Sequence, residues 1–209
     1  MLADTKTYPL LLLVSILLFL LWSVINPYDL FTWFLEVLPV LIGIVALIYL
    51  YPRFKFSNFV YTLIWIHAII LIIGGHYSYA EMPLFNWIRD AFSLDRNYYD
   101  RVGHFAQGFF PAIISREVLL RQTPLKQGKW LNFIIVSICL AFSAAYELFE
   151  FAMAKALGAT ADSFLGSQGD IWDAQWDMTY ALIGAILALA ILGRIHDCVM
   201  GEMDRSYER

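Results

Sequence analysis

Histidines and carboxylates recur in four separate segments of the chain, at spacings that bring side chains together on a helix. Asp100 and His104 are four residues apart, so they share one face if a helix begins near residue 99. Glu147 and Glu150 are three apart, and three later aspartates follow the i, i+3, i+7 pattern of a single helical face. The candidate functional residues are His76, Asp100, His104, Glu147, Glu150, Asp170, Asp173 and Asp177.

Imidazole and carboxylate groups together are ligands that zinc, manganese and iron accept in proteins. Such an ion would polarise a phosphoryl or carbonyl oxygen and activate water for hydrolysis or group transfer. We therefore predict a metal-dependent hydrolase or transferase site with a divalent ion, zinc or manganese, as cofactor. The predicted ligands are His76, Asp100, His104, Glu150 and Asp173, and the predicted general base is Glu147 or Asp177.

The same residues allow a different use and, taken singly, a structural one. In a non-catalytic binder or transporter, the carboxylates would form a site for a cation or a cationic ligand. Single aspartates can cap helices or favour their first turns, and His104 can be a core histidine. Glu147 and Glu150 resist the structural interpretation, because they lie inside an otherwise apolar helix predicted over residues 131–153.

So many carboxylates at one level of a protein repel one another. A metal ion, carboxyl groups that keep their protons, or the guanidiniums of Arg96 and Arg101 would offset that repulsion. The two remaining histidines stand apart from the candidates. His67 is interpreted as a structural residue in the middle of a helix, and His196 as a residue of the C-terminal tail.

The composition decides which kind of protein must position these residues. Of 209 residues, 60% are hydrophobic and 15% are charged, and the mean hydropathy is +0.64. This excludes a water-soluble globule, which has roughly 45–50% apolar and about 25% charged residues. An aromatic content of 17% excludes intrinsic disorder, and a net charge of -4 offers no basic surface for nucleic acid. A membrane protein remains.

Six apolar runs are each close to the roughly 20 residues that span a bilayer. We predict an all-α fold, a polytopic bundle of six transmembrane helices that forms a single domain over residues 1–209. Leu84, Trp87, Ile88 and Ala91 recur at helical spacing and predict a short amphipathic helix in an outer loop. The predicted spans cover residues 10–25, 34–51, 58–75, 104–122, 131–153 and 177–193.

Basic residues indicate how this bundle is oriented, because short cytoplasmic loops carry the excess of Lys and Arg. With the N-terminus inside, the inner segments hold ten of the 14 Lys and Arg residues and the outer segments hold four. Both termini are therefore predicted to be cytoplasmic. Twelve of the 18 carboxylates then fall toward the outer face, at the level of the candidate functional residues.

Four blocks of the sequence resemble a known family. They are GHYSYA at 75–80, RNYYDRVGHF at 96–105, YELFE at 146–150 and GSQGDIWDAQWDM at 166–178. Through these blocks the chain resembles the YjdF-like family of uncharacterised bacterial inner-membrane proteins. It is more distantly similar to VanZ-like membrane proteins, in which an Asp-x-x-x-His step, a Glu-rich helix and a late Asp-rich helix follow in that order. The resemblance implies a multi-pass protein of the bacterial inner membrane and no settled activity. The partners we expect are membrane lipids and, for the predicted hydrolase or transferase site, a lipid-linked or cell-envelope substrate.

Overall fold

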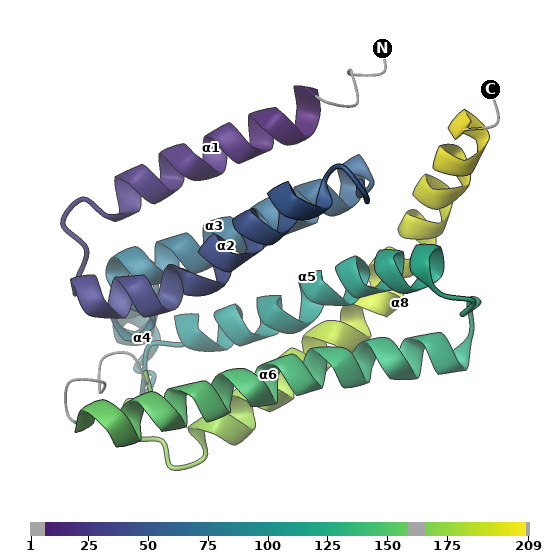
Figure 1. The fold of residues 1–209 in the computed structure, drawn as a ribbon. Helices are drawn as coiled ribbons and strands as arrows, with labels where there is room; N and C mark the ends of the chain where they lie inside the picture. The colour runs from purple at the N-terminus through teal and green to yellow at the C-terminus, as the bar shows by residue number, and fades with distance from the viewer. Residues whose placement is uncertain (1–6, 159–165, 208–209) are drawn as a thin grey trace.

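The computed structural model describes residues 7–158 and 166–207, and every regular element within them is helical (Figure 1). This confirms the predicted all-α class. Seven α-helices and one short 3-10 helix follow one another along the described chain. They are α1 (Thr7–Ser23), α2 (Leu30–Leu50), α3 (Asn58–Tyr77), η1 (Tyr79–Glu81), α4 (Pro83–Phe92), α5 (Tyr99–Gln122), α6 (Lys129–Leu157) and α8 (Asp173–Tyr207).

Four helices, α2, α3, α6 and α8, are long and apolar enough to cross a membrane. α1 is also apolar but has 17 residues. Each of these five helices coincides with one of the predicted apolar runs. Large apolar side chains stay exposed on their surfaces, among them Leu11, Val45 and Phe142 at 61%, 69% and 65%. Apolar surface of this extent is unusual in water and suits contact with lipid.

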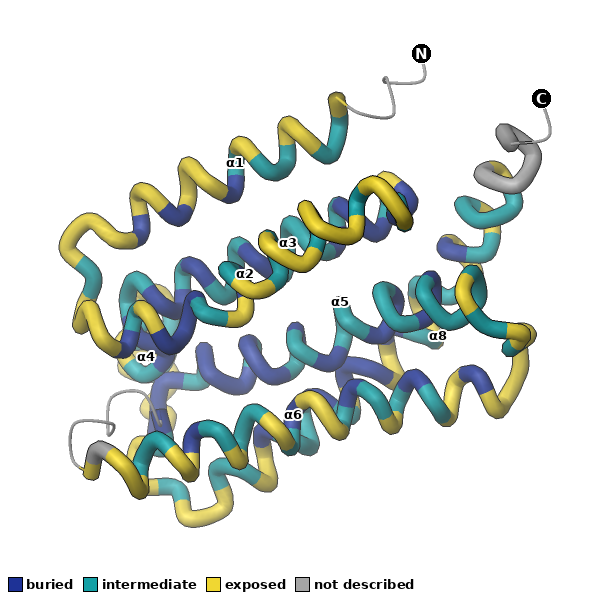
Figure 2. Tube along the Cα trace, in the orientation of Figure 1, coloured by how far each residue is buried: buried dark blue, intermediate teal, exposed yellow. Residues whose placement is uncertain are grey.

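α5 differs from the other long helices because its sequence is much more polar. It packs against α3, α6 and α8 in the middle of the bundle, where Figure 2 shows most of its first half buried. The helix continues through Pro111 without interruption. Charged residues are tolerated in such a helix where neighbouring helices supply their partners. α5 can therefore carry Asp100 and His104 into the interior of the bundle.

A close crossing of α5 and α8 fixes how far along the two helices the candidate residues lie relative to one another. A Cβ atom on Gly108 of α5 would overlap the carbonyl oxygen of Ala181, and one on Gly184 of α8 would overlap the backbone of α5. Small residues at helix crossings allow this backbone contact in membrane proteins. Asp177 lies one turn before Ala181 and His104 one turn before Gly108, so the crossing brings these two side chains level with each other.

The connection between α3 and α5 contains α4, which confirms the predicted amphipathic helix. α4 begins at Pro83, a residue that suits the first helical position because its missing N–H would have no partner there. None of its residues is fully buried, and Leu84 and Trp87 are 54% and 64% exposed. An apolar face of this kind is suited to the headgroup region of a bilayer.

α8 is much longer than the predicted span over residues 177–193. It begins at Asp173 and continues to Tyr207, and His196 is fully buried within it. The interpretation of His196 as a tail residue is wrong. This histidine faces the end of α5, where Arg116 and Glu117 supply polar partners that let the helix continue past the apolar run.

Candidate metal centre

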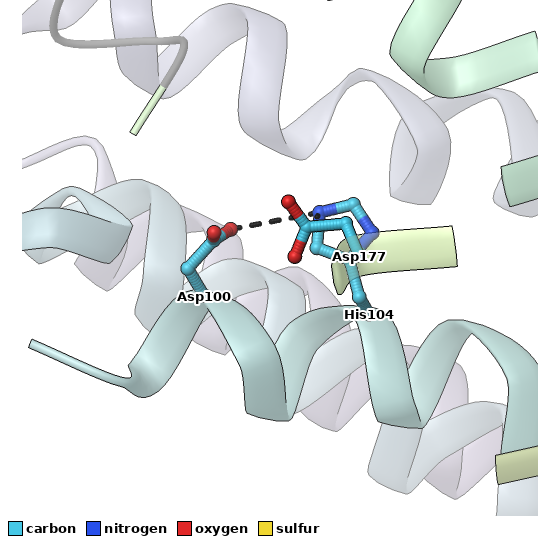
Figure 3. A group of neighbouring side chains, drawn as sticks. All are labelled: Asp100, His104 and Asp177. Carbon is cyan, nitrogen blue, oxygen red and sulfur yellow. Dashed lines mark ion pairs between the residues drawn. The ribbon is translucent and has the colours of Figure 1, made fainter. Parts of the chain in front are cut away.

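Three buried side chains meet where the first turns of α5 and α8 lie side by side (Figure 3). His104 Nε2 is 3.5 Å from Asp100 Oδ1 and 3.7 Å from Asp177 Oδ1. One ligand atom of each residue lies within 4.8 Å of those of the other two. The three residues, here called the Asp–His–Asp group, are 7%, 6% and 1% exposed in chain order. The spacing of Asp100 and His104 predicted their shared face correctly.

The other nitrogen of His104 is held by an amide and a second acid. Nδ1 lies 3.0 Å from Oε1 of Gln107 and 3.6 Å from Oε1 of Glu147 on α6. An imidazole that donates Nδ1–H to such an oxygen presents Nε2 as its free nitrogen. Metal-binding histidines are oriented by an outer hydrogen bond in this way. Nε2 then faces two carboxylate oxygens, an arrangement that requires a proton or a cation between them.

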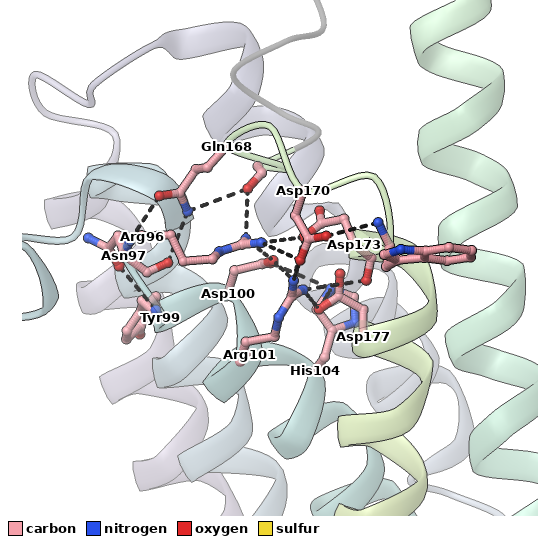
Figure 4. A network of polar contacts seen from close by, with 12 residues as sticks. Arg96, Asn97, Tyr99, Asp100, Arg101, His104, Gln168, Asp170, Asp173 and Asp177 are labelled. Atoms are coloured by element: carbon pink, nitrogen blue, oxygen red, sulfur yellow. Dashed lines mark hydrogen bonds and ion pairs between the residues drawn. The ribbon is translucent and has the colours of Figure 1, made fainter. Parts of the chain in front are cut away.

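Two arginines near the start of α5 offset part of the carboxylate charge (Figure 4). Arg101 contacts Asp177 through Nη1 and Oδ1 of Asp173 through Nη2, the latter at 2.6 Å. Arg96 reaches the same oxygen of Asp173 at 2.6 Å and Oδ2 of Asp100 at 3.4 Å. Both guanidiniums are buried, so salt in the solvent screens these pairs less than surface pairs. The sequence suggested three ways to offset the repulsion between the carboxylates. The structure shows one of them, the ion pairs with Arg96 and Arg101.

The arginines do not balance the whole group. Asp170 lies 3.6 Å from Arg96 and 3.3 Å from Arg101, so four aspartates share two guanidiniums. Two negative charges remain when all four carboxylates are ionised, before Glu147 and Glu150 are counted. Buried charge without a partner is costly. A divalent cation beside the imidazole of the Asp–His–Asp group would balance it.

The residues just before α8 are tied to the residues just before α5. Nε2 of Gln168 donates to the carbonyl oxygen of Asn97, and Oε1 of Gln168 accepts from Asn97 N–H, both at 2.9 Å. Arg96 also donates to the carbonyl oxygen of Gly166 at 3.0 Å. Gly166 has a φ of 61°, a backbone conformation that glycine adopts without strain. These contacts keep Asp170 and Asp173 against the arginines.

A cavity of about 70 Å³ adjoins the Asp–His–Asp group, with walls from α2, α3, η1, α5 and α6. Glu36 of α2 and Glu150 of α6 line it, together with Tyr79 of η1. The ring of Tyr79 fills the space where a Cβ atom on Gly74 or Gly103 would lie, so both glycines are needed to admit it. Burial raises the pKa of Tyr79 well above its ordinary value, and its hydroxyl stays protonated.

Five of the predicted site residues lie close to this cavity or to the imidazole. Asp100 and His104, predicted as ligands, meet Asp177, which the sequence analysis considered as a base. Glu147, the other predicted base, stands beside the Nδ1 nitrogen of the imidazole. Glu150, predicted as a ligand, lines the cavity with Asp100 and His104.

The structure places the other two predicted ligands elsewhere. Asp173 is engaged by both arginines, as described above. His76 lies at the end of α3, where Nδ1 is 2.9 Å from the carbonyl oxygen of Ser23 and the ring is 4.3 Å from that of Trp22. His76 thus joins the end of α1 to α3, and it is not among the residues that meet at the imidazole of His104.

A second polar network, at the far end of α5, was missed in the sequence. Glu117 is fully buried and accepts hydrogen bonds from the backbone N–H and the hydroxyl of Ser57, at 2.7 and 2.6 Å. His196 Nε2 lies 3.1 Å from the same carboxylate, and Arg116 lies 2.6 Å from His196 Nδ1. Adjacent charges at Arg116 and Glu117 inside an apolar run were the available signal for this network.

Comparison with known proteins agrees with the resemblance of the four sequence blocks. Residues 8–198 match the family described as "Predicted membrane protein (DUF2238)". The chain is 43% identical to the inner membrane protein YjdF of Escherichia coli (strain K12) over 191 residues, which cover 90% of this chain and 91% of that protein. No solved structure matches the chain. The chain therefore belongs to the DUF2238 family of predicted membrane proteins.

Proposed function

We propose that this protein is a multi-pass protein of the inner membrane whose Asp–His–Asp group binds a divalent metal ion, zinc or manganese. The ion would serve hydrolysis or group transfer on a lipid-linked or cell-envelope substrate. The observation that carries the proposal is the position of Nε2 of His104, 3.5 and 3.7 Å from carboxylate oxygens of Asp100 and Asp177. Ligand atoms about 2.0–2.2 Å from a tetrahedral ion are about 3.3–3.6 Å apart. Small shifts would let these three atoms share one ion.

We place this site at the outer end of a six-span bundle with both termini in the cytoplasm. α5 counts as a span here, because its 24 residues extend about 36 Å and the hydrocarbon core measures about 30 Å. Because α5 is buried among other helices, it does not need an apolar surface toward the lipid. The distribution of Lys and Arg supports the orientation, and the similarity to an inner membrane protein of Escherichia coli supports the location.

A bound ion would activate a water molecule and polarise a phosphoryl or carbonyl oxygen. Three protein ligands leave one position of a tetrahedral site open, as in catalytic zinc sites. The open position would face the cavity, since Asp100 and His104 both line it. Glu147, beside the imidazole, and Glu150, in the cavity wall, are the groups placed to accept a proton.

The proposed ligand set differs from the one that the sequence predicts. Asp100 and His104 are kept, and Asp177 becomes the third ligand instead of a base. Asp173 is left out because Asp100, His104 and Asp177 are the residues whose ligand atoms converge, and both arginines contact Oδ1 of Asp173. Glu150 is assigned to the cavity, and His76 has no part in the proposed site.

Metal analysis of the purified full-length protein tests the proposal. After incubation with zinc or manganese and removal of free ions, the wild type should retain roughly one ion per chain. His104→Ala and Asp177→Asn should lose it, whereas Glu81→Gln, which removes an exposed outer carboxylate, should retain it. A wild type without bound metal, or an Asp177→Asn variant with unchanged metal content, would overturn the proposal.

A non-catalytic cation site is the second candidate, and the size of the cavity favours it. A cavity of about 70 Å³ holds a few water molecules, and a whole lipid head group needs more. The transport version has less support, because Ala112, Ile113 and Ala185 are fully buried in the hydrophobic core between the two ends of α5 and α8. Metal binding without turnover of any phosphate or acyl ester would select the non-catalytic candidate.

A further inference from the structure

The cavity beside the Asp–His–Asp group contains a buried carboxylate without a partner. Glu150 of α6 is 9% exposed, and within the described part of the chain its side chain has no hydrogen bond and no ion pair. Nε2 of His67, on the α3 side of the same cavity, is buried and also lacks a hydrogen bond. Buried polar groups in native proteins are nearly always hydrogen-bonded. The buried, unpaired Nε2 of His67 and, in the same cavity, a carboxylate for which the described residues provide no hydrogen bond point to a ligand there.

The sign of the charge in the walls indicates a cation. Glu36 of α2 is 6% exposed and lines the cavity together with Tyr146. Asp100 adds a third carboxyl group, and none of the described residues that line the cavity is Lys or Arg. The guanidiniums of Arg96 and Arg101 contact Asp100 at 3.4 and 3.3 Å, in addition to the aspartates on α8 and just before it. Glu36 and Glu150 are therefore the two carboxyl groups of the cavity for which the described residues provide no ion pair.

The walls suit an organic ammonium group better than a second metal ion. Among the residues that the structure describes, Asp100, His104 and Asp177 form the group that converges closely enough to ligate an ion, and Glu36 and Glu150 are outside it. The rings of Tyr79 and Tyr146 line the cavity as well, and aromatic faces attract ammonium groups. A volume of about 70 Å³ accommodates one ammonium and the methylene next to it.

The position of Pro39 gives the side from which such a group can enter. Pro39 lies in α2, one turn beyond Glu36, and it is exposed on the outside of the bundle while also lining the cavity. Its ring cannot donate a backbone hydrogen bond to the helix. A chemical group arriving from the outer half of the membrane would pass Pro39 and meet the two glutamates.

We propose that the cavity formed by Glu36, Glu150, Tyr79 and Tyr146 binds the primary ammonium group of an amine-bearing substrate. The rest of the substrate lies toward Asp100 and His104, at the open position of the metal. This inference rests on the proposed function, because the metal site is what would act on the substrate. The binding of the ammonium group itself depends only on the cavity.

Calorimetry on the full chain in detergent tests the cavity with ethylammonium, and neutral ethanol is the matched probe. Ethylammonium should bind at least about tenfold more tightly than ethanol. Glu150→Gln and Glu36→Gln should each weaken ethylammonium binding about tenfold or more, whereas Glu81→Gln, an exposed control, should not. Equal binding of the two probes to the wild type would overturn the inference, and this comparison needs no variant to fold.

Nanodiscs distinguish a lipid head group from a free amine. In nanodiscs of phosphatidylethanolamine and phosphatidylcholine, mass spectrometry of the intact protein should find phosphatidylethanolamine retained by the wild type and lost from Glu150→Gln. Ethylammonium binding without lipid retention would assign the cavity to a soluble amine.

Metal content measured on the same samples separates the two proposals. Ammonium binding without metal would overturn the proposed function alone, and metal without ammonium binding would overturn this inference alone.

Discussion

His104 is oriented by a single amide one helical turn away. The 3.0 Å contact between its Nδ1 and Oε1 of Gln107 orients the ring, and an Nδ1–H that donates to this oxygen leaves Nε2 free for a metal ion. We expect Gln107→Ala to weaken metal binding about 10–100-fold, the loss typical of an outer hydrogen-bond partner. Titration against a competing chelator measures this, and Gln175→Ala on an exposed part of α8 is the control. Unchanged affinity in Gln107→Ala would contradict the assignment of the proton.

Arg101 should be the residue on which the stability of the acidic cluster depends most. The side chains of its partners Asp173 and Asp177 are 13% and 2% exposed. Removal of one member of a buried ion pair typically costs about 3–5 kcal/mol, so Arg101→Ala should strongly lower the unfolding temperature in detergent. Arg89→Ala breaks a pair with the exposed Asp90 and should cost about 0–1 kcal/mol. Similar losses for the two variants would contradict a buried electrostatic network.

At the scale of helices, the crossing of α5 and α8 controls the site. Gly108→Ala places a methyl group against the backbone of Ala181, so the helices must move apart. We expect a loss of about 1–3 kcal/mol in the free energy of unfolding, together with reduced metal content as Asp177 leaves His104. Gly193→Ala on α8 meets open space and should be neutral or stabilising, because Ala is the better helix former. Normal metal content in Gly108→Ala would show that the crossing does not set the site.

Apolar periodicity was sufficient to predict the helices, and residue spacing was sufficient to predict that Asp100 and His104 share a face. Neither pattern tells which neighbour a helix meets or how the helix is rotated about its axis. His76 therefore ends α3 as predicted but turns toward Ser23 of α1. Glu36 lies in an apolar run with no partner nearby in sequence. His196 lies beyond the point where hydropathy falls, yet the helix continues because its polar residues face α5.

At the scale of the whole molecule, polar residues gather at the two ends of α5. The Asp–His–Asp group lies at one end, and the network of Glu117 and His196 lies at the other. Between them, the buried residues Ala112, Ile113 and Ala185 form an apolar layer. In a bilayer, this division would leave one cluster near each interface, as expected if α5 crosses the membrane.

Cysteine labelling in whole cells tests the proposed orientation. In a background without Cys139 and Cys198, Asp90→Cys should react with a membrane-impermeant maleimide, because residue 90 is exposed in a connection that the proposed orientation puts outside. Lys126→Cys, exposed between α5 and α6, should react only after the membrane is permeabilised. Labelling at residue 126 in intact cells would reverse the bundle and move the acidic cluster to the cytoplasmic side.

The partnership of α5 with α8 also constrains how the protein is made. α8 supplies Asp173 and Asp177 to the arginines at one end of α5, and His196 to Glu117 at the other. Fifty residues separate the two helices in the chain, so α5 emerges from the ribosome well before these partners exist. Charged residues in a helix that inserts into the membrane are costly until they find partners. α5 should therefore remain near the translocon until α8 arrives, and a nascent chain that stops short of α8 would expose unpaired charges to membrane proteases.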